Sequence, residues 1–172
     1  NAGQCGFRQN HMTQKLKISS ALDTFPKLLG DLVSSRGESV AIREKNYGIW
    51  QSWTWREYME EARDVANSLA KSGFNRGDKL AIIGDNRPEL YFGIMASQML
   101  GGVPVPIYQD SIAEEMVYIL QHAEVRFAIV EDQEQVDKLL AIRDKLPNLE
   151  FIIYEDSRGL RDYEERGLMS YE

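Results

Sequence analysis

The sequence predicts an α/β fold with a largely parallel sheet flanked by helices and preceded by a β-hairpin. Short runs rich in β-branched residues alternate with segments of helical periodicity over residues 77–154. Residues 77–108 have the order strand, helix, strand, which forms a right-handed crossover in a parallel sheet. Two earlier strand-like runs are separated by Asn46-Tyr47-Gly48, a turn that suits a hairpin.

The first helix is expected to begin at Thr24 and to stop at Gly37. Pro26 fits its first turn, and apolar residues then recur at spacings of three and four. The hairpin strands follow at Val40–Lys45 and Ile49–Trp53, where β-branched and aromatic residues are frequent.

The second helix is expected to start with a capping box. Thr54-x-x-Glu57 has the spacing at which the threonine accepts from the helix and the glutamate reaches back, and Gly73 ends the helix. Tryptophans crowd this region at Trp50, Trp53 and Trp55. Without flanking Lys or Arg clusters, a core or interface role is favoured over a platform for stacking bases.

The central crossover contains a strand at Lys79–Ile83 and an apolar helix at Leu90–Leu100. Asp85 or Asn86 is expected to cap that helix. The helix has no wide polar face, so it requires packing partners on more than one side. Val103–Ile107 contains two prolines, which cannot donate to a sheet ladder, so this strand is expected at an edge or a bulge.

The next helix is expected to begin with a second capping box, Ser111-x-x-Glu114. His122 follows near its C-terminus. We interpret it as a capping or partly buried histidine and not as a catalytic base.

The segment Arg126–Gln133 repeats the pattern of Lys79–Asn86: basic, apolar, Ala, Ile, apolar, break, cap. This similarity predicts the same strand-to-helix connection a second time. A helix over Val136–Arg143 follows, Pro147 breaks it, and Phe151–Tyr154 is a further strand.

The chain divides into three expected regions. Residues 1–12 lack periodicity, and Asn1-Ala2 resembles a scar left by tag removal, so this segment is expected to be a remnant or a disordered leader. Residues 13–155 form the α/β portion of the fold. Residues 156–172 are a polar tail in which Ser170 has the character of an N-cap, so the chain is expected to stop before the next element.

Composition excludes several classes of protein. The 172 residues are 43% hydrophobic and 27% charged, which is typical of a globular domain. Residues 1–108 carry 13 basic and 11 acidic side chains, whereas the remainder carries 7 and 16, so the net charge of −7 lies in the second part. Duplex nucleic acid binding requires clustered Lys and Arg, and this distribution argues against it.

Cys5 and His11 lack a paired metal-ligand spacing.

Two motifs resemble a known family. RPELYFGIMASQMLGGVPVPIY (87–108) is similar to an early segment of the AMP-forming acyl-CoA synthetases, and WTWREY (53–58) is similar to the short motif that precedes it. The resemblance runs from about Leu22 onward and is strongest to bacterial long-chain fatty-acid–CoA ligases. It implies the N-terminal part of the large domain of an adenylate-forming synthetase.

The resemblance implies a two-step reaction for the whole enzyme. ATP and a fatty acid form an acyl adenylate with release of pyrophosphate, and coenzyme A then attacks the adenylate, with Mg²⁺ as the metal. The family's phosphate loop, its ribose-binding Asp and its catalytic Lys have no counterpart here, so no catalytic or metal-binding residue is assigned. This portion is therefore expected to bind none of these cofactors and to be inactive alone. Tyr108, Gln109 and Asp110 correspond to a region that approaches coenzyme A in some relatives.

The partners expected for the whole enzyme are fatty acid, ATP and coenzyme A, with no nucleic acid and no transmembrane segment. A cytoplasmic location is expected, with peripheral membrane attachment of the whole enzyme left open. The Leu90–Leu100 helix is expected to lack one packing partner within this chain, which predicts a two-fold dimer. The alternative to a ligase fragment is a stand-alone flavodoxin-like module for binding, signalling or assembly, without catalysis.

Overall fold

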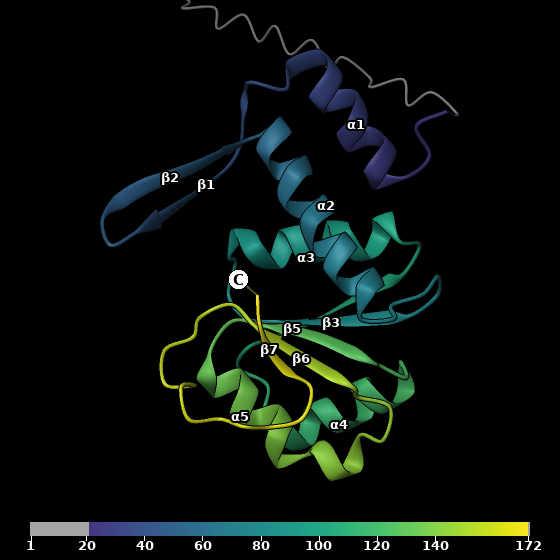
Figure 1. The fold of residues 1–172 in the computed structure, drawn as a ribbon, viewed down its shortest axis with the longest axis vertical. Helices are drawn as coiled ribbons and strands as arrows, with labels where there is room; N and C mark the ends of the chain where they lie inside the picture. Colours follow the sequence, from purple (N-terminus) through teal and green to yellow (C-terminus); the bar gives the residue numbers. More distant parts are fainter. Residues whose placement is uncertain (1–20, 172) are drawn as a thin grey trace, which may run out of the picture.

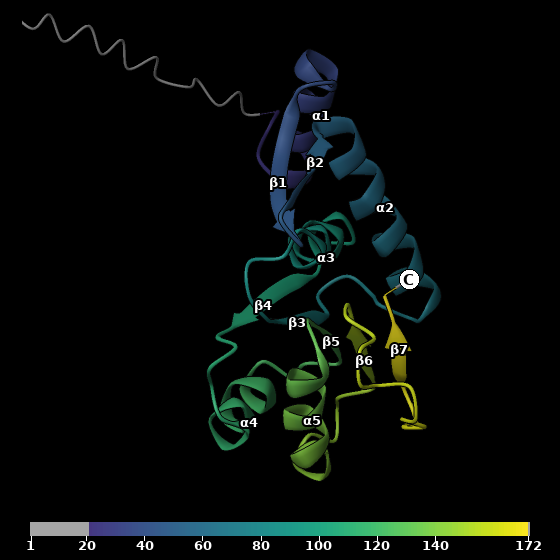
Figure 2. The ribbon, with the colours of Figure 1, turned by 90° about the vertical axis from the view of Figure 1, so that its left-hand side faces the viewer.

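A computed structural model describes residues 21–171. A five-stranded parallel sheet in the order β4-β3-β5-β6-β7 lies at the centre, with a two-stranded antiparallel hairpin to one side (Figure 1). Helices α1, α2 and α3 lie on one side of the sheet, and α4 and α5 lie on the other (Figures 1 and 2). The helices are α1 Phe25–Arg36, α2 Trp55–Lys71, α3 Pro88–Met99, α4 Ala113–His122, α5 Gln133–Ala141 and the 3-10 helix η1 Arg143–Lys145. The strands are β1 Val40–Asn46, β2 Ile49–Thr54, β3 Lys79–Ile83, β4 Val103–Ile107, β5 Phe127–Val130, β6 Phe151–Tyr154 and β7 Leu168–Ser170.

The predicted fold class, an α/β fold with a largely parallel sheet preceded by a hairpin, is confirmed. Tyr47 and Gly48 join β1 to β2 with φ of 47° and 83°, the left-handed backbone that a tight hairpin turn requires. The capping box of α2 is present as predicted. Thr54 Oγ1 accepts from the Glu57 amide at 3.2 Å, and Glu57 Oε2 accepts from the Thr54 amide at 2.7 Å.

Strand β4 is an edge strand, as its prolines predict. The amide of Val103 donates to Asp78 O at 2.9 Å, so the backbone N–H and C=O groups of the odd-numbered residues of β4 point toward β3. Pro104 and Pro106 occupy the alternate positions, whose donors would otherwise face away from the sheet. The outer side of β4 therefore has few amide donors for pairing with another strand.

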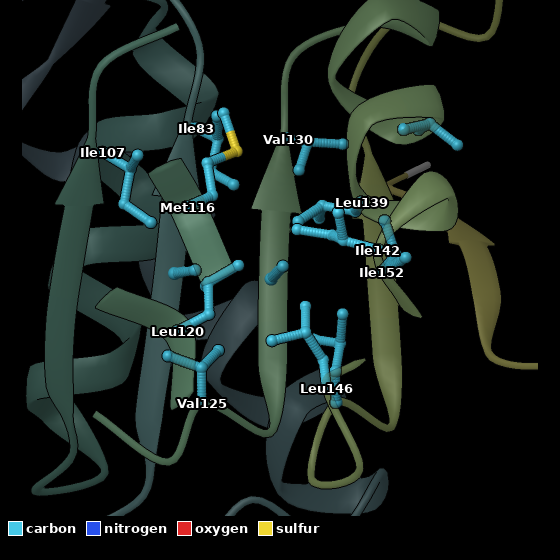
Figure 3. Packing of buried hydrophobic residues seen from close by; sticks show 14 of the residues in the cluster. Ile83, Ile107, Met116, Leu120, Val125, Val130, Leu139, Ile142, Leu146 and Ile152 are labelled. Atoms are coloured by element: carbon cyan, nitrogen blue, oxygen red, sulfur yellow. The ribbon is translucent and has the colours of Figure 1, made fainter. Parts of the chain in front are cut away.

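Both faces of the sheet are buried, and alternate residues of each strand belong to different cores. Leu80 and Ile82 of β3 pack toward α3, whereas Ala81 and Ile83 pack toward α4 and α5. Figure 3 shows the second of these cores, where α4 contributes Met116 and Leu120. Burial on two faces explains why the strands read as continuous apolar runs without alternation.

Helix α3 has packing partners on both sides within this chain, and the prediction that one was missing is wrong. On one side it packs against α1 and α2, and on the other against the sheet (Figure 1). Phe92 is buried, with Trp53 at 5.9 Å and Tyr58 at 5.1 Å between ring centroids. Gly93 allows close approach to the sheet, because a Cβ there would lie 2.7 Å from Ile129 Cδ1.

Trp53 is half-buried and contacts the core residue Phe92, whereas Trp50 is exposed. His122 ends α4 and is exposed, not partly buried, with its ring stacked on Tyr118 at 5.6 Å.

Two predicted helix starts are wrong. The N-cap of α3 is Arg87, without a side-chain cap bond. The oxygens of the predicted caps have other partners, since Asp85 Oδ1 accepts from the Asn86 amide and Asn86 Oδ1 accepts from the Tyr91 hydroxyl.

The N-cap of α4 is Ile112 and not Ser111, again without a side-chain cap bond. Glu114, predicted to close that capping box, instead binds Lys145 Nζ at 2.7 Å. By contrast, Asp132 caps α5 as the repeated pattern predicts, accepting from the Gln135 amide at 3.3 Å.

The end of the described chain also differs from expectation. Helix α5 stops at Ala141, ahead of η1 and well before Pro147. Ser170 is the last residue of β7 and pairs with Tyr154 of β6, and a helix that it could cap would lie outside the described residues. The apolar pair Leu168-Met169 allows this short strand to extend the sheet. Cys5 and His11 lie outside the described residues, as does the whole expected leader.

Candidate functional site

The carboxyl ends of β3, β4, β5 and β6 meet at one edge of the sheet, and the loops that follow them form the candidate site. In open parallel sheets, ligands bind outside this edge, where the strand order reverses. Here the chain passes from β3 to β4 on one side and returns to β5 on the other, so the reversal lies at β3. The loops concerned are 84–87, 108–112, 131–132 and 155–158.

The predicted residues Tyr108, Gln109 and Asp110 lie together just after β4. They line a shallow depression of ≈430 Å³ shared with the loop 84–86. Tyr108 is 87% exposed, and its carbonyl accepts from the Ser111 amide at 3.1 Å. Lys138 Nζ of α5 donates to Gln109 O at 2.6 Å, which fixes the backbone of this loop. The exposed phenol of Tyr108 is accessible to a ligand at this edge of the sheet.

A charged network, which we call the Arg87 clasp, occupies the point where the strand order reverses. It consists of Arg87, Glu44 of β1 and Glu131, which follows β5. Arg87 Nε donates to Glu131 Oε1 at 2.9 Å, and its Nη1 donates to Glu44 Oε1 at 2.6 Å. The second Glu131 oxygen accepts from the Asp85 amide at 2.6 Å. These bonds, first to Glu44 and then to Glu131, raise the pKa of the Arg87 guanidinium.

The clasp fills the crevice and joins the hairpin to the sheet. Gly84 permits it, because a Cβ at that position would lie 2.6 Å from Glu131 Cβ and 2.8 Å from Leu90 Cδ1. The side chains of Glu44 and Glu131 are only 15% and 12% exposed. Carboxylates so little exposed need a cation, and Arg87 supplies it to both.

A polar pocket of ≈280 Å³ lies between the hairpin and the loop after β6. Arg158 Nε donates to Asp156 Oδ1 at 2.9 Å, and its Nη1 donates to the Tyr47 hydroxyl at 3.1 Å. Burial, and then the nearby Glu89, raise the pKa of Glu155 to about 7. This pocket therefore holds paired charges and one carboxyl group that titrates near neutral pH.

The described residues contain neither a metal-binding cluster nor a membrane-spanning helix. Among residues 21–171, no group of three or more His, Cys, Asp or Glu is placed to hold a metal ion. The same part of the chain contains no helix long and apolar enough to cross a membrane.

The sequence reasoning missed Glu131, Arg87, Glu44 and Glu155. One signal was available for Glu131. The repeated pattern aligned it with Gly84, so both residues directly follow parallel strands and were bound to meet at the same edge. Glu44 had no local signal, because its partner lies far away in the sequence.

Comparison with protein families gives one matching model. Residues 32–168 match the model described as AMP-binding enzyme.

Curated relatives are long-chain ligases. The chain is 32% identical over 134 residues to long-chain-fatty-acid–CoA ligase ACSBG2 of Xenopus laevis, covering 77% of this chain and 18% of that protein. It is 28% identical over 152 residues to ACSBG1 of Bos taurus, covering 86% and 21%. The chain thus spans about a fifth of the length of the curated relatives that it matches.

Solved structures share the fold. The anthranilate CoA ligase AuaEII, in complex with anthranoyl-AMP, superposes with a TM-score of 0.70 at 25% identity, covering 76% of this chain and 24% of that one. The N-terminal domain of FACL13 from Mycobacterium tuberculosis superposes with a TM-score of 0.71 at 23% identity, covering 78% and 34%. The architecture described above is that of the N-terminal domain of adenylate-forming enzymes.

Proposed function

Since its family model matches residues 32–168, the chain belongs to the AMP-binding enzyme family, and we propose that it supplies the N-terminal α/β scaffold of a long-chain fatty-acid–CoA ligase. The 32% identity to a long-chain ligase over most of this chain is the observation that carries the proposal. The reaction proposed for the whole enzyme joins a fatty acid to coenzyme A by way of an acyl adenylate, with ATP converted to AMP and pyrophosphate.

The proposed role of these residues is structural. The Arg87 clasp and the Asp132 cap of α5 hold loops of the carboxyl edge in place. Tyr108, Gln109 and Asp110 are proposed to lie beside the path of coenzyme A. The exposed phenol of Tyr108 and the fixed backbone of Gln109 favour this proposed position. In phosphoryl-transfer sites Mg²⁺ is held by one or two carboxylates together with the phosphates of the substrate, and we assign no such ligand among residues 21–171.

We propose that this chain has no ligase activity alone. Attack of a fatty carboxylate on the α-phosphate of ATP, with pyrophosphate leaving, requires donors aimed at the charge that develops on the phosphates, and the two arginines of the carboxyl edge are already paired with carboxylates. Pyrophosphate release from purified chain with ATP, Mg²⁺ and palmitate should equal the background without protein. Release that rises with chain concentration, and survives repurification, would contradict the proposal.

A second candidate is a stand-alone flavodoxin-like module for binding or assembly. The strand order β4-β3-β5-β6-β7 favours it, because it is the flavodoxin order when strands are counted from β3. The Arg87 clasp speaks against it, since Glu131 fills the crevice in which such a sheet would hold a phosphate group. Titration with flavin mononucleotide separates the two, and the ligase proposal expects no binding.

The location proposed for the whole enzyme is the cytoplasm, with peripheral attachment to a membrane suited to its acyl substrate. The expected two-fold dimer loses its physical basis. It was predicted because α3 was expected to lack a packing partner, and α1, α2 and the sheet supply that partner within one chain.

A further inference from the structure

A groove of ≈400 Å³ lies on the α2 side of the sheet, between α2 and the strands β6 and β7. Figure 2 shows the C-terminal end of α2 beside β7. The floor of the groove is apolar and comes from both sides. Helix α2 contributes Val65 and Leu69, and the sheet contributes Ile129, Ile153 and Met169. Val65 and Met169 are half-buried, so they retain surface that a partner would cover.

The rim of the groove is acidic. Glu61 and Asp64 of α2 line it, and no Lys or Arg side chain of residues 21–171 does so. Both carboxylates are exposed on the helix surface. Partial burial, and then the charge of Asp64, raise the pKa of Glu61.

Tyr171 adds a polar group at the end of the groove. Its backbone is fixed to the sheet, because its amide donates to Tyr154 O at 2.9 Å. Its hydroxyl is buried and has no hydrogen-bond partner among residues 21–171. Burial, and then the charges of Glu61 and Glu89, raise the pKa of this phenol. A cationic N–H that enters the groove would meet the acidic rim beside the Tyr171 ring.

An apolar floor with an acidic rim is complementary to a helix whose apolar stripe is bordered by basic side chains. We propose that this groove docks an amphipathic helix of a partner polypeptide, with lysine or arginine side chains against Glu61 and Asp64. A second copy of the chain is a poor donor, since α2 to α5 each carry more acidic side chains than Lys and Arg. Helix α1 is the exception, but its Lys27 pairs with Asp23 and its Arg36 lies over the Trp55 ring.

The test uses a helical peptide of roughly 14 residues, about four turns, with a leucine stripe bordered by lysines. Its binding to the chain is followed by fluorescence anisotropy. The double variant Glu61→Lys with Asp64→Lys should weaken binding by about tenfold or more, because two favourable charge contacts become repulsive. The matched control is Glu115→Lys with Asp144→Lys, which makes the same charge change at exposed positions on the α4 and α5 side. It should change the affinity by less than about twofold.

Amide chemical shifts on peptide addition should change at Val65, Met169 and Tyr171. Equal weakening by the rim and control variants would show attraction to net charge only and overturn the proposal. No binding, shift changes confined to other surfaces, or equal binding of a peptide with glutamates in place of the lysines would also overturn it. Sedimentation of the chain alone tests whether a second copy occupies the groove. A dimer that the rim variant dissociates would make a second copy the occupant and reject the partner helix.

Discussion

Substitution of Arg87 by methionine should destabilise the chain markedly. The variant keeps most of the apolar side-chain volume but removes the cation between Glu44 and Glu131, whose carboxylates are 15% and 12% exposed. Removing one partner of a fully buried pair costs about 3–5 kcal/mol, whereas an exposed pair contributes about 0–1 kcal/mol. Arg87 itself is 37% exposed, which places the expected loss of unfolding free energy near 2 kcal/mol. For a chain of this length, that lowers the melting temperature by about 6 °C.

Urea denaturation at pH 7, followed by tryptophan fluorescence, measures this loss. Arg158→Met is the matched control, because Arg158 pairs with Asp156 but is 75% exposed, and it should cost less than about 0.5 kcal/mol. Adding Glu131→Gln to Arg87→Met should recover part of the loss by removing an uncompensated charge. The reasoning is refuted if Arg87→Met and Arg158→Met have the same unfolding free energy.

Three further predictions follow from the same structure. Thr54→Ala should lower the unfolding free energy by about 1 kcal/mol, while Ser111→Ala should change it by less than about 0.5 kcal/mol, since the Thr54 side chain caps a helix and that of Ser111 does not; equal effects in denaturant melts would contradict this. Gly93→Val should lower the unfolding free energy by about 2 kcal/mol by overpacking against Ile129. A thermal midpoint equal to that of the wild type would show that the contact between α3 and the sheet is looser than described. Glu155 has a raised pKa of about 7, so the folded state holds its proton more tightly than the unfolded chain and stability falls as pH rises from about 4.3 to 7. After a discount for partial exposure, Glu155→Gln should be more stable than wild type by about 1 kcal/mol at pH 8 and equal to it at pH 4, and a constant difference at both values would count against the assignment.

Local patterns predicted the elements whose determinants are local. Strand β3 occupies Lys79–Ile83 as predicted, because an apolar run between two turns is sufficient to define it. The capping box at Thr54 is correct, since both of its bonds join residues three positions apart. The edge position of β4 also follows from its own prolines.

Predictions failed where another side chain competes for the local group. Glu114 binds Lys145 instead of closing a capping box, and the Asn86 oxygen binds the Tyr91 hydroxyl instead of capping α3. Strand β7 was not predicted, because nothing in the sequence around Ser170 shows that β6 has a free edge. The Lys145 contact and the pairing of β7 depend on how distant segments pack, which local sequence does not show.

The candidate site also divides into residues that the sequence could indicate and contacts that it could not. Tyr108, Gln109 and Asp110 were selected by resemblance, and the structure places them in one depression with the loop 84–86. The Arg87 clasp could not be predicted because its acidic partners come from the hairpin and from the end of β5. Composition showed the acidic balance of the chain but not which carboxylates face one another.

The most direct test of the proposed function is a graft. Residues 32–168 of this chain, the part that matches the family model, would replace the corresponding segment of the long-chain ligase ACSBG2. Formation of palmitoyl-CoA from palmitate, ATP and coenzyme A would be measured, with intact ACSBG2 as the positive control and a graft carrying Arg87→Met as the comparison. The account predicts that the graft folds and forms palmitoyl-CoA, and that Arg87→Met lowers its melting temperature. A graft that is folded by circular dichroism and melts cooperatively, yet forms no palmitoyl-CoA, would contradict it.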